Sequence, residues 1–309
     1  MNPEGAGSPH ERPTIMTPVA VKERIIHIGL AAVAGMSLVL LLLIVFFLVH
    51  EGVGLFSHVS LGGFVFGMDW YPTEDPPVFG ILPMLAASFA ITVYATLIAV
   101  PLGLFTAIYL TEIAPAGVRR IIKPAIELLA AFPSVVIGFF GMVVVAPFLQ
   151  KTFGLAVGLN MTNAALMLAV MSVPTICSIA EDALYSVPRT LREASLALGA
   201  TRWETIRHVT VPAAFSGLAT AVMLGMSRCI GETMVVLMVA GGAGIIPTSI
   251  FDPVRPMTAT MAAEIGEAPF RGEHYQALFC IGLFLFIFTF IFNQIAFTLS
   301  EKRKQEYKG

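Results

Sequence analysis

Residues 76–111 read PPVFGILPMLAASFAITVYATLIAVPLGLFTAIYLT and contain no Asp, Glu, Lys or Arg. A helix rises about 1.5 Å per residue, so about 20 residues are enough to cross a hydrocarbon core of about 30 Å. Five more charge-free runs of 20 residues or longer flank this one, at 25–50, 128–150, 152–180, 208–227 and 274–300. The sequence therefore predicts an all-α polytopic membrane protein.

The composition excludes an ordinary soluble domain. Of the 309 residues, 57% are apolar and only 12% are charged, and the mean hydropathy is +0.84, whereas soluble domains carry about 25% charged residues. Cys177, Cys229 and Cys280 lie in apolar runs and form no CxxC pair. We therefore expect neither a disulfide framework nor a metal site, and we interpret the cysteines as buried apolar residues.

The apolar runs predict six transmembrane spans, at about 28–49, 81–110, 125–149, 163–185, 212–240 and 274–299. With these spans, 14 of the 18 Lys and Arg residues fall on one side of the membrane, three fall on the other, and Arg228 lies inside a span. Cytoplasmic loops carry the excess of basic residues in membrane proteins. Both termini and the second and fourth loops are therefore predicted to be cytoplasmic.

One transmembrane domain, residues 25–300, is expected between two cytoplasmic tails. Residues 1–24 contain four prolines and few residues that could pack, so they predict a disordered tail. Residues 301–309 are expected to form a short basic tail. Membrane lipid is an expected partner of this chain and nucleic acid is not.

Residues 188–211, between the fourth and fifth spans, read PRTLREASLALGATRWETIRHVTV. Pro188 suits the first turn of a helix, and apolar residues such as Leu191 and Leu198 follow it on one face. Gly199 has a low helix propensity and predicts a break, after which a second apolar face continues. We expect two short cytoplasmic helices with an apolar stripe, and the pattern alone fits an amphipathic connector as well as a docking element.

A charged pair lies in the fifth span. From 208 to 251 only Arg228 and Glu232 are charged, and a spacing of four residues places them on one face of a continuous helix, in a stripe with Ala221 and Gly225. Charges at membrane depth are costly and tend to face a pathway or each other. Because a guanidinium offers donors suited to an oxyanion, the pair is either an anion contact or a self-neutralising pair that fixes helix packing.

Segment 188–211, together with Pro212, resembles the cytoplasmic signature of ABC-importer permeases, which reads E-A-A, three residues, G, nine residues and I-x-L-P. The spacing is kept here, with Ser, Val and Val in place of Ala, Ile and Leu. In that family the segment docks into a cleft of the ATPase subunit, and we call residues 188–211 the coupling segment. The resemblance assigns ATPase coupling to Glu193, Ala194, Ser195, Gly199, Ala200, Val209, Val211 and Pro212.

The ATPase itself is expected on another chain. No GxxxxGKS/T motif, which would cradle nucleotide phosphates, occurs in this sequence. The resemblance therefore implies that this chain is not an enzyme and holds no cofactor, and that ATP and Mg are used by a partner ATPase.

Residues 228–233 resemble the R-x-x-G-E-T motif of permeases in the phosphate-specific ABC importer. Arg228, Gly231, Glu232 and Thr233 match the motif, and in that family the Arg and Glu are implicated in phosphate translocation. The resemblance thus implies that these four residues belong to the substrate pathway. The form GETM looks more like the PstC type of subunit than the PstA type, and further likeness covers most of residues 69–300.

The resemblance implies a multi-pass subunit of a transporter in the bacterial cytoplasmic (inner) membrane. Its expected partners are a homologous PstA-type permease, a PstB-type ATPase dimer and a PstS-type phosphate-binding protein outside the cytoplasm. Two alternatives stay open: a permease for another tetrahedral oxyanion, such as sulfate, molybdate or a phosphonate, and a secondary anion transporter without an ATPase. An intramembrane enzyme is disfavoured because no HExxH or paired-ligand spacing occurs.

Overall fold

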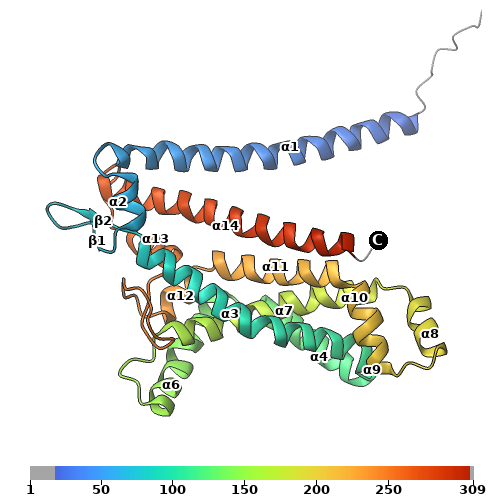
Figure 1. Ribbon diagram of the computed structural model, residues 1–309. Helices are drawn as coiled ribbons and strands as arrows, with labels where there is room; N and C mark the ends of the chain where they lie inside the picture. Colours follow the sequence, from blue (N-terminus) through green and yellow to red (C-terminus); the bar gives the residue numbers. More distant parts are fainter. Residues whose placement is uncertain (1–17, 307–309) are drawn as a thin grey trace, which may run out of the picture. The chain divides into compact units, whose positions relative to one another are not determined.

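The structure, a computed structural model, describes residues 18–306, and apart from one short hairpin its regular elements are helices (Figure 1). The chain divides between Phe47 and Leu48 into two compact units. The first unit contains most of helix α1 (Pro18–Gly52), whose apolar side chains are largely exposed. Because α1 begins at Pro18, residues 18–24 are helical and the expected disordered tail 1–24 is wrong there; residues 1–17 lie outside the described part.

The second unit is built on three helices that pack along one another: α3 (Leu82–Ile108), α7 (Met161–Tyr185) and α11 (Phe215–Gly231). Ile176 of α7 is 1% exposed and lies between a glycine of each neighbour. A Cβ on Gly103 of α3 would lie 2.7 Å from Ile176 Cγ2, and a Cβ on Gly225 of α11 would collide with Ile176 Cγ1. The two glycines therefore allow both helices to approach α7 closely, as small residues do in membrane helix bundles.

The third span begins later than expected. Helix α4 (Ala116–Ala131) ends before Pro133, and the apolar stretch Ser134–Phe153 follows as α5 (Ser134–Phe140), a π-helical turn (Gly141–Val145) and α6 (Ala146–Phe153). The expected span 125–149 is wrong at its start because its first residues belong to α4. A proline disfavours helical backbone at the residue before it, and Phe132 is indeed extended, with ψ 134°.

A second difference lies in the fifth span. Helix α11 ends at Gly231, and a separate helix, α12 (Met234–Val239), follows it, so the expected continuous span 212–240 is wrong. Before α11 the chain forms α8 (Arg189–Ala197), α9 (Arg202–Thr205), a π-helical turn (Ile206–Thr210) and α10 (Val211–Ala213). Helices α8 and α9 lie at one end of the bundle (Figure 1).

The opposite end of the bundle carries a small cap with its own apolar core. It contains a 3-10 turn (Val53–Ser57), α2 (Leu61–Phe66), the hairpin of β1 (Trp70–Tyr71) and β2 (Val78–Phe79), and α13 (Met257–Glu264). The cap packs on the start of α14 (Glu273–Glu306), and Phe64, Phe79 and Met257 are buried in their common core. Because α14 continues to Glu306, residues 301–306 of the expected basic tail are helical, and 307–309 lie outside the described part.

Within residues 18–306, five helical segments are long and apolar enough to cross a membrane: Ile26–Ser57, Leu82–Ile113, Ser134–Phe153, Met161–Tyr185 and Glu273–Ile295. A sixth is present if Arg202–Ala213 and Phe215–Gly231, which are bent by 71° relative to each other, form one span. The predicted all-α polytopic class is thereby confirmed.

Candidate functional site

The charged motif lies at a break between two helices. Arg228 is in the last turn of α11, whereas Glu232 follows the end of that helix in an extended conformation, with φ −74° and ψ 130°. The expected placement of both charges on one face of a continuous helix is therefore wrong. No ion pair joins these two side chains in the part of the chain that the structure describes.

The rotation of α11 directs Arg228 away from the bundle core. Cys229 is 4% exposed, and its sulfur lies 3.0 Å from the hydroxyl oxygen of Ser172 on α7. Ala221 and Gly225 share this buried side, so the inward repeat of four residues continues through Cys229. Arg228 is exposed. The expected stripe that combined Ala221 and Gly225 with Arg228 is wrong by one position.

Glu232 satisfies the backbone at the break. Its Oε1 accepts hydrogen bonds from the backbone N–H groups of Met234 (3.1 Å) and Val235 (3.4 Å), at the start of α12. Its backbone carbonyl accepts a hydrogen bond from the hydroxyl of Thr258 on α13, at 2.9 Å. Irregular backbone at membrane depth needs such partners because lipid offers none. In this conformation the Glu232 carboxylate thus caps a helix.

A hollow of about 360 Å³ adjoins the break. Its lining consists of Gly231, Thr233, Thr258, Met261, Ala262, Ile265 and Leu285. Both hydroxyls in this lining donate to backbone carbonyls: Thr258 to that of Glu232, and Thr233 to that of Gly231 at 3.4 Å. None of these lining residues is charged, so the hollow by itself does not suit an anion. The exposed guanidinium of Arg228 is the better contact for one.

The coupling segment forms two short helices with a break where the sequence predicts it. Gly199 has φ +90°, a backbone conformation that glycine adopts at little cost. Thr201 and Glu204 form a capping box at the start of α9: the Thr201 hydroxyl accepts the Glu204 N–H at 3.3 Å, and the Glu204 carboxylate accepts the Thr201 N–H at 2.8 Å. Local hydrogen bonds therefore fix the turn between α8 and α9.

Large apolar side chains of this segment are exposed, with Leu198 at 90% and Trp203 at 59%. Among the residues assigned to coupling, Glu193, Ala194 and Gly199 are exposed, whereas Ser195, Ala200, Val209, Val211 and Pro212 are partly buried. The Ser195 hydroxyl lies 3.0 Å from that of Thr205 on α9. Large exposed apolar side chains on a short helical segment are compatible with a docking surface.

Three ion pairs that the sequence does not reveal join elements at this end of the bundle. Arg192 of α8 lies 2.9 Å from Glu112, in the π-helical turn (Tyr109–Ile113) that follows α3. Glu181 of α7, 2% exposed, lies 2.9 Å from Arg119 and 3.4 Å from Lys123, both on α4. The partners are 80 and about 60 residues apart in sequence, so only the tertiary fold brings them together.

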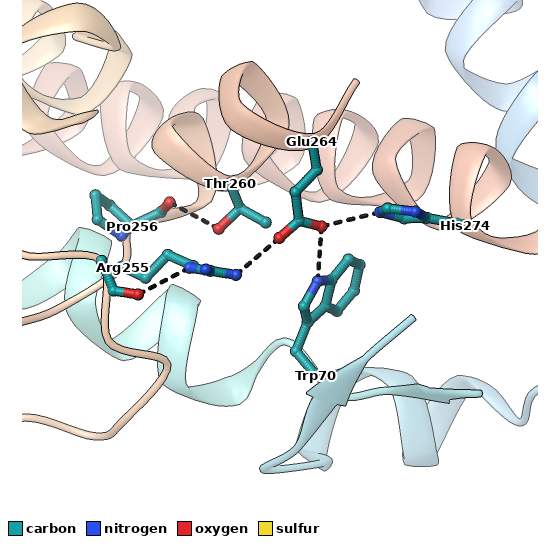
Figure 2. A network of polar contacts seen from close by, with 7 residues as sticks. Trp70, Arg255, Pro256, Thr260, Glu264 and His274 are labelled. Atoms are coloured by element: carbon teal, nitrogen blue, oxygen red, sulfur yellow. Dashed lines mark hydrogen bonds and ion pairs between the residues drawn. The ribbon is translucent and has the colours of Figure 1, made fainter. Parts of the chain in front are cut away.

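At the other end of the bundle, one carboxylate joins three segments (Figure 2). Glu264 of α13 lies 2.7 Å from Arg255 and 2.9 Å from the Nε2 atom of His274 on α14. It also accepts a hydrogen bond of 2.9 Å from the indole N–H of Trp70 in β1. The hairpin, the loop before α13 and the start of α14 are thereby held around a single side chain.

The loop between α12 and α13 contains a second locally satisfied carboxylate. The Asp252 side chain accepts the backbone N–H groups of Ser249 and Thr248 and the Thr248 hydroxyl, at 2.8–2.9 Å. These hydrogen bonds favour the charged form and lower the pKa of Asp252 below its ordinary value. The loop is therefore more stable with Asp252 ionised.

A family profile described as "Binding-protein-dependent transport system inner membrane component" matches residues 99–305. The match includes the coupling segment and the charged motif at the end of α11. This chain belongs to that family.

Relatives of this inner membrane component are similar over most of their length. The "Probable ABC transporter permease protein YqgH" of Bacillus subtilis is 42% identical over 81% of this chain and 81% of its own. The "Phosphate transport system permease protein PstC" of Mesorhizobium japonicum is 38% identical, over 79% of this chain and 80% of its own. The protein of the same name from Haemophilus influenzae is 36% identical, over 74% and 77%.

Solved structures with the same fold are also transporter subunits. A chain of the MetNI methionine ABC transporter has a TM-score of 0.55 at 21% identity, over 72% of this chain and 94% of its own. A chain of a bacterial ABC transporter for alginate has a TM-score of 0.62 at 15% identity, over 91% and 98%. At these identities the likeness concerns the fold. With its family and its apolar helices, the inner membrane component described here is a multi-pass integral membrane subunit of a transport system.

Proposed function

We propose that this permease is the PstC-type subunit of an ATP-driven importer of inorganic phosphate in the bacterial cytoplasmic (inner) membrane. The names of the relatives at 38% and 36% identity support this substrate. The observation that carries the proposal is the exposed guanidinium of Arg228, in the last helical turn before a capped break in a span. Arg228, Gly231, Glu232 and Thr233 line the pathway in this proposal.

Arg228 suits a transient phosphate contact. A guanidinium presents a planar fork of donors that matches two phosphate oxygens, and it stays charged at any physiological pH. The neighbouring hollow offers no second cation, so the affinity contributed by this chain is low. A weak site allows release, and the remaining contacts come from a PstA-type permease that faces this chain.

The coupling segment docks onto a PstB-type ATPase dimer in this proposal, and ATP and Mg are bound there. Support comes from the exposed Leu198 and Trp203, which need an apolar partner surface. The excess of basic residues in its loop supports a cytoplasmic position for the coupling segment. A PstS-type binding protein then meets the opposite end of the bundle and delivers phosphate.

The test is uptake by proteoliposomes that contain both permeases and the ATPase, with the binding protein outside. We expect Arg228→Lys to lower phosphate uptake at least tenfold, because an ammonium cannot present two coplanar donors. Arg120→Lys, at an exposed position of α4, is the matched control and leaves uptake unchanged.

Three results would contradict parts of this proposal. Near-normal uptake by the Arg228→Lys variant argues against the bidentate contact. If sulfate, molybdate or a phosphonate inhibits the uptake of labelled phosphate more strongly than unlabelled phosphate does, the substrate is that other oxyanion. Uptake that continues without the ATPase and ATP identifies a secondary transporter.

A further inference from the structure

Helix α8, the first half of the coupling segment, is attached to the rest of the chain at very few points. It contains no buried residue, and only Arg192 and Ser195 of its nine residues are partly buried. The chain on its C-terminal side turns at Gly199 with a positive φ, and Pro188 precedes its N-terminus. A force applied to α8 therefore reaches the bundle mainly through the backbone at its ends and through these two partly buried side chains.

The side chains of Ser195 and Arg192 contact different elements. Ser195 contacts Thr205 of α9, which is itself part of the coupling segment. Arg192 leaves the segment: its Nη2 atom lies 2.9 Å from Glu112 Oε1, after α3, and donates to the Leu184 carbonyl of α7 at 2.8 Å. Arg192 is thus the one side chain of α8 that reaches both α3 and α7 in the described part of the chain.

Apolar packing between α8 and the end of α3 is sparse around the Arg192–Glu112 ion pair. A hollow of about 140 Å³ lies between α8, α9 and the end of α3, and Glu112, Arg192, Leu196 and Arg202 are among its lining residues. The Arg192 and Glu112 side chains are only 21% and 11% exposed, so their attraction is weakly screened by solvent. An ionic contact across a hollow holds α8 where apolar packing is sparse.

We propose that Arg192 and Glu112 are positioning residues that transmit displacement of the coupling segment to α3. The proposal rests on the docking of this segment to an ATPase, which the proposed function includes. When the ATPase moves α8, the ion pair pulls the end of α3 with it, and the Leu184 contact keeps α7 in the same block. Without the pair, α8 can pivot between Pro188 and Gly199, and less of its movement reaches the end of α3.

The α4 contacts explain why α3 needs a link of its own. Glu181 ties α4 to α7 through Arg119 and Lys123, and α7 is joined to α8 by three residues of backbone. Helix α3 packs along α7, but no short backbone connection joins it to the coupling segment. The Glu112 carboxylate is therefore the direct contact between the end of α3 and α8.

The experiment measures phosphate imported per ATP hydrolysed, in proteoliposomes that contain the complete complex and the binding protein. We expect Arg192→Ala and Glu112→Ala each to lower this ratio at least fivefold while the ATPase still co-purifies with the permeases. The exchange Arg192→Glu with Glu112→Arg keeps the summed length of the two side chains and restores at least half of the wild-type ratio. Arg120→Ala, an exposed arginine on α4, leaves the ratio unchanged.

The outcomes separate this inference from the function on which it rests. A purely structural pair lowers uptake and hydrolysis together, without a change in their ratio and without rescue by the exchange, and this result overturns the inference. If an Ala variant does not assemble, Glu112→Gln, which keeps the shape of the side chain and removes its charge, is expected to lower the ratio at least threefold. A wild-type ratio for Glu112→Gln contradicts the proposal. Failure of the ATPase to co-purify with the wild-type permease refutes the proposed function instead.

Discussion

The contact of Ile176 with Gly225 predicts that Ile176→Ala and Gly225→Ala together reduce the free energy of unfolding by much less than the sum of their separate effects. Ile176→Ala removes about 80 Å³ of side chain, and at about 24 cal/mol per Å³ of residual cavity this costs about 2 kcal/mol. The transfer term adds little, because lipid is as apolar as the protein interior. Gly225→Ala alone places a methyl group against Ile176 Cγ1, and overpacking of about 2 kcal/mol is offset by about 1 kcal/mol of helix propensity.

In the double variant the new methyl group enters the space that Ile176 leaves. We expect a total cost of about 1 kcal/mol instead of the additive value of about 3 kcal/mol, which is a coupling of about 2 kcal/mol. Unfolding of the purified permease in mixed micelles, titrated with a denaturing detergent and followed by circular dichroism, measures these free energies. Gly117→Ala on α4, where a Cβ meets open space, is the control and shows no coupling to Ile176→Ala. Additive costs for Ile176→Ala and Gly225→Ala would refute the packing argument.

Three further predictions concern carboxylates. Replacing Arg119 by Ala leaves Lys123 beside the buried Glu181 and lowers the free energy of unfolding by about 1 kcal/mol. Replacing both cations lowers it by about 3 kcal/mol, which is more than the sum of the single effects, because Glu181 is then buried without a partner. Additive costs in the same unfolding assay would contradict this. Glu232→Ala removes the cap of α12, costs about 1 kcal/mol and speeds hydrogen exchange at the start of α12, so unchanged exchange argues against the cap. The lowered pKa of Asp252 means that its hydrogen bonds stabilise the loop above the ordinary pKa of about 3.9 and that this is lost as the pH falls through the lower folded value. Asp252→Asn should therefore speed hydrogen exchange of the loop at pH about 7, and this effect should shrink as the pH falls below about 3.9; an effect that does not depend on pH would refute the assignment.

The sequence predicts features that depend on neighbouring residues. The apolar runs identify the helices long enough to cross a membrane, because span length follows from composition alone. The turn at Gly199 is also predictable, since the glycine and the Thr201–Glu204 box act over a few residues. The third span starts later than its apolar stretch suggests because Pro133 separates α4 from α5.

Features that depend on distant partners could not be predicted. Helix α11 ends between Arg228 and Glu232, where no proline marks a break, and the break is completed by Thr258, 26 residues after Glu232. A shared face for Arg228 and Glu232 requires a continuous helix, and the break after Gly231 removes it. Arg192 is one of four arginines in the coupling segment, and no local pattern distinguishes the one that meets Glu112.

The 71° bend between Arg202–Ala213 and α11 has a mechanical consequence. A push along the axis of the first arm resolves into components along and across α11 that scale with the cosine and sine of 71°, about 0.33 and 0.95. A displacement along the axis of Arg202–Ala213 would therefore move α11 mainly perpendicular to its own axis. Arg228, near the far end of α11, would then move mainly sideways, with little displacement along the axis of α11.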